Sequence, residues 1–147
     1  MANRKSKSED PVKVFLASAA EARIEAERLR AKLTRLEAIA ARKGTDEQTA
    51  QVEELKAQTS NAIIRAEELD ADATQFIKSL PDPAHRTLLK LRYCEGLDWV
   101  GPPLRRTVQS EMAKVSPAYT YSERSIYRLH GEALKKAREL YKERQTK

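Results

Sequence analysis

The sequence predicts an all-α protein in which an N-terminal antiparallel two-helix coiled-coil hairpin precedes a three-helix helix-turn-helix domain. Its 147 residues include only four Gly and six Pro, and 34% are charged, a composition typical of long helices. Over the first 80 residues, apolar side chains recur at alternating spacings of three and four, which is the coiled-coil pattern. Residues 84–147 hold 14 Lys and Arg against 7 Asp and Glu, a net of +7, whereas residues 1–83 hold 14 against 15.

The first long helix is expected to begin at Asp10-Pro11, where a capping residue precedes a proline at the first helical position. The polar residues 1–10 are expected to form a disordered tail. Gly44 suits the end of this helix and places the turn near residues 44–46. The predicted seam consists of Val12, Phe15, Ala19, Ala22, Ala26, Leu29, Leu33, Leu36 and Ala40.

The second long helix is expected to begin at Thr45, which forms a capping box with Gln48. Its predicted seam consists of Val52, Leu55, Thr59, Ala62, Ala66, Leu69, Ala73, Phe76 and Leu80. A short connection favours an antiparallel hairpin over residues 11–80, in which seam positions pair where their numbers sum to 91 or 92. The expected pairs include Phe15 with Phe76, Ala22 with Leu69, Leu29 with Ala62, and Leu36 with Leu55.

Five isoleucines lie outside the two seams: Ile24, Ile39, Ile63, Ile64 and Ile77. A two-helix hairpin buries little area per residue, so self-association or docking onto the C-terminal domain would cover these side chains. In the other interpretation they are singly exposed apolar residues, which are ordinary on protein surfaces.

The C-terminal domain is expected over residues 81–141, followed by a basic tail over residues 142–147. Pro81 ends the second long helix, and Asp82-Pro83 repeats the pattern of a cap followed by proline. An interruption at Gly101-Pro102-Pro103 and a loop over Ser116–Thr120 separate the predicted helices. These helices span residues 84–95, 104–115 and 122–140.

The last of these helices has the polarity of a DNA-recognition helix. Ser122 is its expected N-cap. Its apolar residues recur at helical spacing, whereas its first turns carry side chains that donate hydrogen bonds well. In a helix-turn-helix domain the apolar face of such a helix seats on the other two helices, and its polar front enters the major groove. The residues expected on the buried face are Ile126, Leu129, Ala133 and Leu134.

The middle helix offers two further arginines. Arg105 and Arg106 are expected at its front, where they are candidates for phosphate contacts or simply an exposed pair. The basic excess fits a polyanionic partner, and it equally fits a solvated basic face. The candidate DNA-binding residues are Arg105, Arg106, Ser122, Arg124, Ser125, Tyr127 and Arg128.

Two stretches of this domain resemble known sequences. "HRTLLKLRYCEGLDW" (His85–Trp99) resembles the start of the promoter-reading region four of bacterial sigma factors, and "SERSIYRLHGEALKKA" (Ser122–Ala137) is similar to its recognition helix. Both stretches also resemble a family of small phage and prophage proteins, including regulators of late transcription, that join a helical hairpin to such a domain. The resemblance covers roughly residues 80–140 and implies double-stranded DNA and host RNA polymerase as partners.

The matches to that family lie in two motifs, and one spacing departs from its pattern. Trp99 and Ser122 are 23 residues apart here, farther than in the family. Residues 104–115 can still supply the middle helix, with Glu111-Met112-Ala113 matching its core. The insertion near residues 100–120 then bears on the angle between the two DNA-facing helices. The matching residues are Asp82, Pro83, Arg86, Leu89, Leu91, Arg92, Tyr93, Gly96, Leu97 and Trp99, then Tyr121, Ser122, Arg124, Ile126, Tyr127, Arg128, Leu129, His130, Gly131, Ala133 and Leu134.

No catalytic centre, metal site or cofactor site is expected. His85 and His130 lie on different predicted helices without other ligands at metal-binding spacing, and the four glycines stand too far apart for a phosphate loop. Cys94, the only cysteine, and Trp99 are expected to be packing residues. No apolar run approaches the ~18 residues that a bilayer crossing needs, so the expected location is the cytoplasm of a bacterial host.

These observations lead to the hypothesis of a sequence-specific transcription regulator of phage or prophage origin, with residues 122–140 in the DNA major groove. Two alternatives stay open. One is the small DNA-recognition subunit of a phage packaging terminase, which needs a ring-like oligomer. The other is an adaptor of RNA polymerase that binds no DNA. The hairpin also offers a surface for a homo-oligomer.

Overall fold

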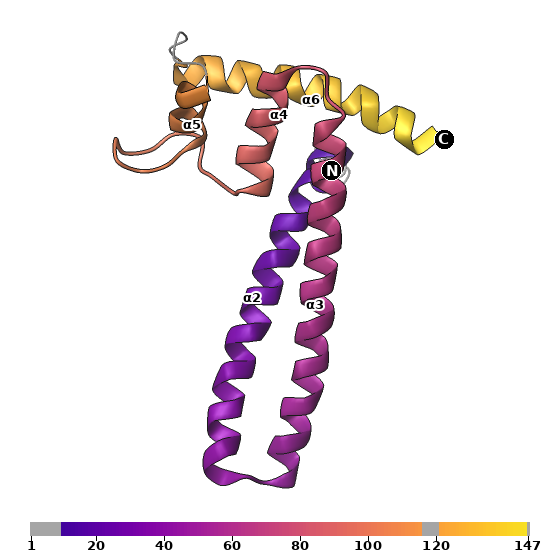
Figure 1. Ribbon diagram of the computed structural model, residues 1–147, viewed down its shortest axis with the longest axis vertical. Helices are drawn as coiled ribbons and strands as arrows, with labels where there is room; N and C mark the ends of the chain where they lie inside the picture. Colours follow the sequence, from indigo (N-terminus) through magenta and orange to yellow (C-terminus); the bar gives the residue numbers. More distant parts are fainter. Residues whose placement is uncertain (1–9, 116–120, 147) are drawn as a thin grey trace, which may run out of the picture. The chain divides into compact units, whose positions relative to one another are not determined.

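The computed structural model describes residues 10–115 and 121–146 of the chain, and every regular element within these ranges is a helix. The predicted all-α class is therefore confirmed. Residues 1–9 of the expected tail over residues 1–10 and the expected loop Ser116–Thr120 lie outside the described residues. The elements are α2 (Pro11–Lys43), α3 (Asp46–Lys78), α4 (Pro83–Leu89), the π-helix η1 (Lys90–Cys94), α5 (Val108–Val115) and α6 (Glu123–Thr146) (Figure 1).

The chain divides into two compact units. The hairpin unit is Ser18–Ala71, which contains most of α2 and α3 and the connection between them. The C-terminal unit contains the described residues on either side, 10–17, 72–115 and 121–146. The first turns of α2 and the last turns of α3 therefore contribute to the C-terminal unit, not to the hairpin unit.

The two long helices end and begin at the residues that the sequence indicates. Asp10 accepts a hydrogen bond from Val12 N through Oδ1 (3.0 Å), as expected of an N-cap. Gly44 has φ +59° and its N donates to Ala40 O (2.7 Å), which closes α2 in the left-handed conformation that glycine tolerates best. Thr45 Oγ1 accepts from Gln48 N (3.1 Å), but Gln48 Oε1 makes no hydrogen bond with any residue that the structure describes, so the predicted capping box is one-sided.

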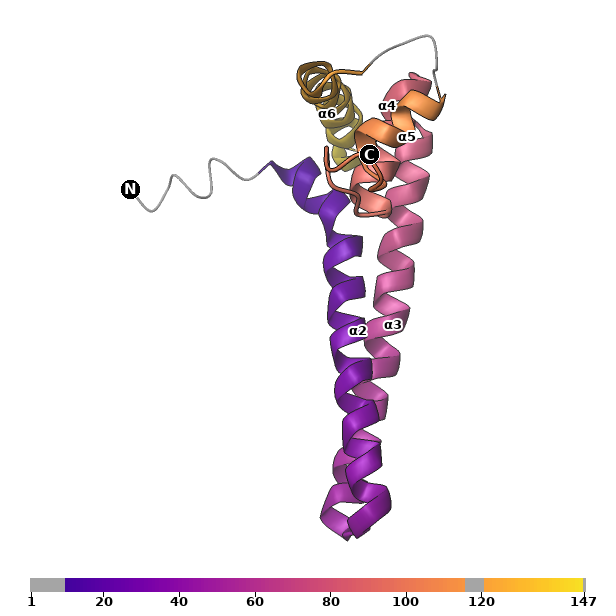
Figure 2. The same cartoon turned by 90° about the vertical axis from the view of Figure 1, so that its left-hand side faces the viewer.

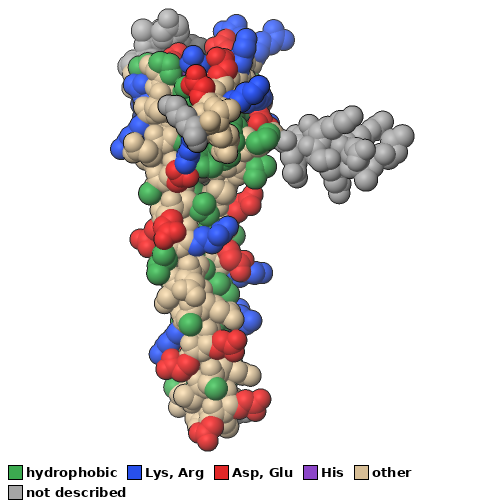
Figure 3. Space-filling view, turned by 90° about the vertical axis from the view of Figure 1, so that its right-hand side faces the viewer, with side chains coloured by type: hydrophobic (Ala, Val, Ile, Leu, Met, Phe, Trp, Pro, Cys, Tyr) green, Lys and Arg blue, Asp and Glu red, His purple; other side chains and the backbone are tan. Residues whose placement is uncertain are grey.

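The predicted register of the hairpin is also found. Leu36 and Leu55 face each other from α2 and α3, and Ala22 and Leu69 line a second hollow between the same helices. The same pairing continues in the C-terminal unit, where the rings of Phe15 and Phe76 have centroids 5.4 Å apart. On the face shown in Figure 3, acidic and basic side chains are interspersed along the hairpin unit.

The C-terminal unit has a continuous apolar core. The helix α4 contacts both α5 and α6 (Figures 1 and 2). The off-seam residue Ile77 is 4% exposed and belongs to this core, whereas Ile24, Ile39 and Ile64 remain exposed in the hairpin unit. The largest fully buried side chains are Leu16, Leu80, Leu88, Leu89, Met112 and Ile126.

The helix that follows Pro81 is longer and less regular than a simple α-helix. Asp82 Oδ1 caps it by accepting from Ala84 N (2.9 Å), and α4 continues as the π-turn η1. Gly96, with φ +70°, ends it, and Leu97 N donates back to Leu91 O (3.1 Å). The predicted helix over residues 84–95 is thus present, with one π-helical stretch that the sequence does not indicate.

The middle helix begins later than predicted. The expected helix 104–115 is wrong at its start, because α5 begins at Val108 and Leu104 is fully exposed. Thr107 is the reason: its Oγ1 accepts from Ser110 N (3.1 Å) while Ser110 Oγ accepts from Thr107 N (2.8 Å), a reciprocal cap that starts the helix there. Met112 is buried as expected, whereas Ala113 is exposed.

The last helix is longer than predicted. The apolar pattern indicated an end near residue 140, with a basic tail from 142, but α6 continues to Thr146. Contacts near its end, described below, account for the extra length.

Candidate nucleic-acid interface

The helix α6 has one fully buried face. Ile126, Ala133 and Ala137 are 0% exposed, Leu134 is 3% exposed, and Leu129 is partly buried against the same core. These positions follow the helical spacing, so the face predicted to seat on the other helices does so. The opposite face of the first turns is consequently directed away from the core.

Arg124 and Arg128 lie on that opposite face. Both side chains are exposed, and neither forms an ion pair with any residue that the structure describes. The two positions are four residues apart, so their guanidinium groups emerge one turn from each other. Two unpaired cations at this spacing can reach neighbouring phosphates or the acceptor atoms of a guanine.

The serines at the start of α6 have a structural task. Ser122 Oγ accepts from Ser125 N (3.1 Å), which confirms Ser122 as the N-cap, and Ser125 Oγ donates to Ser122 O (2.9 Å). Both hydroxyls are therefore engaged in local hydrogen bonds, and any contact of theirs with DNA stays a prediction.

Tyr127 is held at the edge of this surface. Its side chain is 44% exposed, its hydroxyl donates to Glu123 Oε1 (3.4 Å), and its ring stands edge-on to Trp99 with centroids 5.6 Å apart. The ring thus packs on one side and leaves the other accessible for stacking.

Trp99 joins η1 to α6. Its ring centroid lies 4.4 Å from that of His130, and the guanidinium carbon of Arg92 lies 4.7 Å from the Trp99 ring centroid. Arg92 also donates to Leu97 O (3.0 Å). Trp99 packs against the core, as the sequence predicts, and it fixes the front half of α6.

His130 is a packing residue and not part of the cationic surface. Its Nε2 lies 2.9 Å from the Tyr93 hydroxyl. Burial lowers the pKa of His130 to about 4, and the nearby positive charges of Lys13, Arg92 and Arg138 act in the same direction. The ring is therefore neutral at pH 7.

Arg105 and Arg106 are not at the front of the middle helix, where the sequence predicted them. Both precede Thr107 in the connection that leads to α5. Arg105 pairs with Asp98 (2.6 Å), and Arg106 pairs with Glu95 (2.7 Å) and Glu111 (3.3 Å). The acidic partners lie on other segments, so the loop geometry, rather than the spacing of the arginines, decides their surroundings.

The far half of α6 is attached to the beginning of α2 and the end of α3. Arg138 Nε donates to Asp10 Oδ2 (2.7 Å), and Arg144 pairs with Asp72. Burial acts to raise the pKa of Asp10, but the hydrogen bonds from Arg138 and Val12 outweigh it and lower that pKa. No sequence signal reveals these contacts, since Asp10 and Arg138 are separated by 128 positions.

Aromatic rings complete the attachment. The Tyr141 ring lies 5.2 Å from Phe15 and 5.9 Å from Phe76, centroid to centroid, and the Arg144 guanidinium carbon lies 5.1 Å from the Phe15 ring centroid. These contacts explain why α6 passes its predicted end, because its last turns pack on the first turns of α2 and the last turns of α3, within the C-terminal unit.

A third connection positions the start of α6. Gln109 Nε2 donates to Tyr121 O (2.6 Å), which ties α5 to the residue just before the Ser122 cap. Sequence reasoning did not indicate the positioning roles of Gln109, Arg92 and Tyr93, because each acts through a partner that is not its neighbour in the chain.

Within residues 10–115 and 121–146, no three His, Cys, Asp or Glu side chains gather as metal ligands would. In those ranges no helix has the length and apolar character that a bilayer crossing requires. Cys94 Sγ lies 3.9 Å from Thr74 Oγ1, and the residue packs against the core.

Comparison of the chain with profiles of known protein families, with curated proteins and with solved structures gave no match.

Proposed function

We propose that this protein is a sequence-specific double-stranded DNA-binding regulator of transcription, of phage or prophage origin, that acts in the cytoplasm of a bacterial host. The front of α6 enters the major groove, and α5 crosses the phosphates beside it. The observation that carries the proposal is the pair Arg124 and Arg128, exposed and without an acidic partner in the described residues, on a helix whose other face is fully buried.

Charge and rigidity support the same interpretation. Residues 84–147 carry a net of +7, and phosphate neutralisation supplies most of the affinity of such domains. The contacts of Trp99, Gln109 and Tyr141 hold α6 along its length, so little ordering is required on binding. The transcription role itself comes from the likeness of residues 80–140 to sigma region four, and host RNA polymerase is the partner that this likeness implies.

The test is selection of bound duplexes from a random library, followed by binding measurements with the selected duplex and an unrelated one. Arg128→Ala is expected to lose about 1–3 kcal/mol more on the selected duplex than on the unrelated one, because a bidentate contact to guanine is sequence-dependent. Arg35→Ala, which removes an exposed arginine from α2, is the matched control and should change neither affinity.

Each outcome assigns a role. Equal losses on both duplexes would make Arg128 a phosphate contact. A wild-type protein that binds no duplex at low salt but does bind RNA polymerase would replace the proposal with the adaptor function. Selection of a packaging-site sequence by a ring of eight or more chains would favour the terminase subunit.

A further inference from the structure

The seam of the hairpin unit is incompletely buried. Among its large apolar side chains only Val52 and Leu55 are buried, at 8% and 5% exposure. The remaining leucines of the seam are half-buried, although they occupy positions that a coiled coil normally covers. These leucines are Leu29, Leu33, Leu36 and Leu69.

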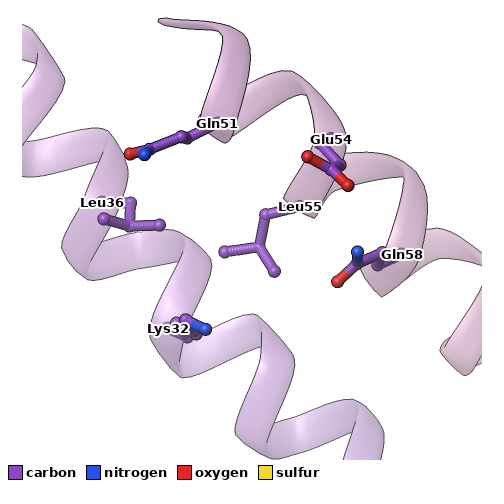
Figure 4. Close-up of a pocket in the computed structure, with 6 residues that line it drawn as sticks. All are labelled: Lys32, Leu36, Gln51, Glu54, Leu55 and Gln58. Atoms are coloured by element: carbon purple, nitrogen blue, oxygen red, sulfur yellow. The ribbon is translucent and has the colours of Figure 1, made fainter. Parts of the chain in front are cut away.

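Two hollows between α2 and α3 lie where the seam side chains are incompletely buried. The larger, of about 380 Å³, is lined by Lys32, Leu36, Gln51, Glu54, Leu55 and Gln58 (Figure 4). The smaller, of about 260 Å³, is lined by Ser18, Glu21, Ala22, Glu25, Ala62, Arg65 and Leu69. Each volume is many times the about 30 Å³ share of one water molecule, so side chains of another helix fit there.

Both hollows lie on one face of the hairpin. Their α2 borders are Ser18, Glu25 and Lys32, and their α3 borders are Gln51, Gln58 and Arg65. Each set recurs every seven residues, so it forms a straight row along a coiled coil. We call the two hollows together the seam groove.

The border of the seam groove is self-complementary in charge: its acidic residues can pair with its basic residues on a second chain. The register that pairs Leu36 with Leu55 places Glu25 opposite residue 66, within one residue of Arg65. Glu25 and Arg65 do not pair within the chain, since Glu25 bonds Arg28 instead (2.6 Å). A two-fold rotation about an axis parallel to the hairpin places the α2 row of one chain against the α3 row of a second chain. Each Glu25 would then meet the Arg65 of the other chain.

We infer that the seam groove is the docking surface for a second copy of this chain, and that two hairpins form a four-helix bundle. The bundle covers Leu36 and Leu69, the half-buried leucines that line the groove, and makes the Glu25–Arg65 ion pair twice. The groove carries both signs of charge, with Glu21, Glu25 and Glu54 beside Lys32 and Arg65, which suits a like surface better than a polyanion. The inference does not depend on DNA binding.

The test is sedimentation equilibrium of the full chain, with helicity monitored by circular dichroism. The wild-type protein is expected at twice its 16.7 kDa chain mass. Glu25→Arg alone, or Arg65→Glu alone, should raise the dimer Kd at least about tenfold, because like charges then meet twice across the interface. Glu27→Arg makes the same charge change at an exposed α2 position outside the groove and should leave Kd unchanged.

Mixing the two groove variants separates contacts between chains from contacts within one chain. An equimolar mixture of Glu25→Arg and Arg65→Glu chains should form a heterodimer with wild-type affinity. In that heterodimer the introduced arginine of one chain faces the introduced glutamate of the other, and the native Arg65 of the first faces the native Glu25 of the second. A mixture that stays as weak as its components overturns the inference. A wild-type protein that sediments at the mass of one chain at about 100 μM, the middle of the micromolar-to-millimolar range of weak association, also overturns the inference. The same holds if Glu27→Arg raises the dimer Kd as much as Glu25→Arg does.

Discussion

Arginine side chains of the C-terminal unit differ in what surrounds them, and this decides what each can do. Arg138 and Arg144 hold α6 to Asp10 and Asp72 of the same unit, and Arg92 covers Trp99. Arg105 and Arg106 have carboxylate partners within 3.3 Å, so a phosphate would have to replace an existing contact. Only a charge that is exposed and unpaired gains the full attraction of DNA, because it gives up no partner on binding.

The buried ring of His130 provides a prediction at the residue scale. Its pKa is about 4 in the folded protein and about 6.5 in an unfolded chain, so between these values only the unfolded state binds the proton. Stability is therefore fully present above pH 6.5 and falls as the pH drops toward 4. Between pH 7.5 and 5, the wild-type protein is expected to lose about 1 kcal/mol more than His130→Gln, a figure reduced for the partial exposure of the ring.

Urea denaturation of both proteins at the two pH values measures this difference. Carboxylates titrate in both proteins, so their contribution cancels in the comparison. Identical pH dependence of the two unfolding free energies would contradict the neutral, buried state of the His130 ring.

At the element scale, helix ends decide more than helix interiors. The cap at Thr107 shortens the middle helix by four residues relative to the apolar pattern, which leaves Leu104 fully exposed and moves both arginines into a loop. At the other end of the unit, packing of Tyr141 extends α6 beyond its apolar stripe. Local hydrogen bonds and tertiary contacts thus override periodicity at the positions where periodicity is weakest.

Two glycines give opposite predictions for the same substitution. A Cβ on Gly96 or on Gly131 meets no atom within 4 Å, so space does not decide either case. Gly96 has φ +70°, and Gly96→Ala is expected to cost about 1–2 kcal/mol of backbone strain. Gly131 lies within α6, where Gly131→Ala should stabilise by about 0.5–1 kcal/mol through helix propensity.

Thermal and urea unfolding of the two variants, each compared with the wild-type protein, measures both effects. Loss of stability in Gly131→Ala would mean that α6 is not a regular helix at that point. An unchanged Gly96→Ala would mean that the end of η1 lies elsewhere.

At the scale of the whole molecule, the uneven charge distribution matters most. The excess of +7 lies in residues 84–147, and the remainder of the chain is nearly neutral. Counter-ion release from DNA should therefore be caused by the C-terminal unit, with the hairpin contributing little.

Salt dependence tests this division. The logarithm of the DNA-binding constant is expected to fall linearly with the logarithm of salt concentration, by about 0.9 for each phosphate neutralised. Arg124→Ala should reduce the magnitude of that slope by about 1, whereas Arg105→Ala should leave it unchanged because Asp98 already pairs with Arg105. Equal effects of the two variants would show that the Arg105–Asp98 pair opens on DNA.

The sequence by itself determined the all-α class, the register of Leu36 with Leu55, the caps at Asp10, Asp82 and Ser122, and the buried face of α6. These features follow from periodicity and from hydrogen bonds between residues two or three positions apart, so they are encoded locally. It also singled out Arg124 and Arg128, since they lie opposite an apolar stripe.

Only the tertiary structure decided which charges are paired and which are free. The partners of Arg138, Arg144 and Arg106 come from distant segments, and the Trp99–His130 contact joins the loop after η1 to α6. Likewise, the periodicity of the seam predicted that Leu29 and Leu33 face the other helix, but not that they would stay half-exposed. Burial depends on how much of the surroundings a second helix fills, and side-chain pairing depends on distances in space; neither is a property of spacing along the chain.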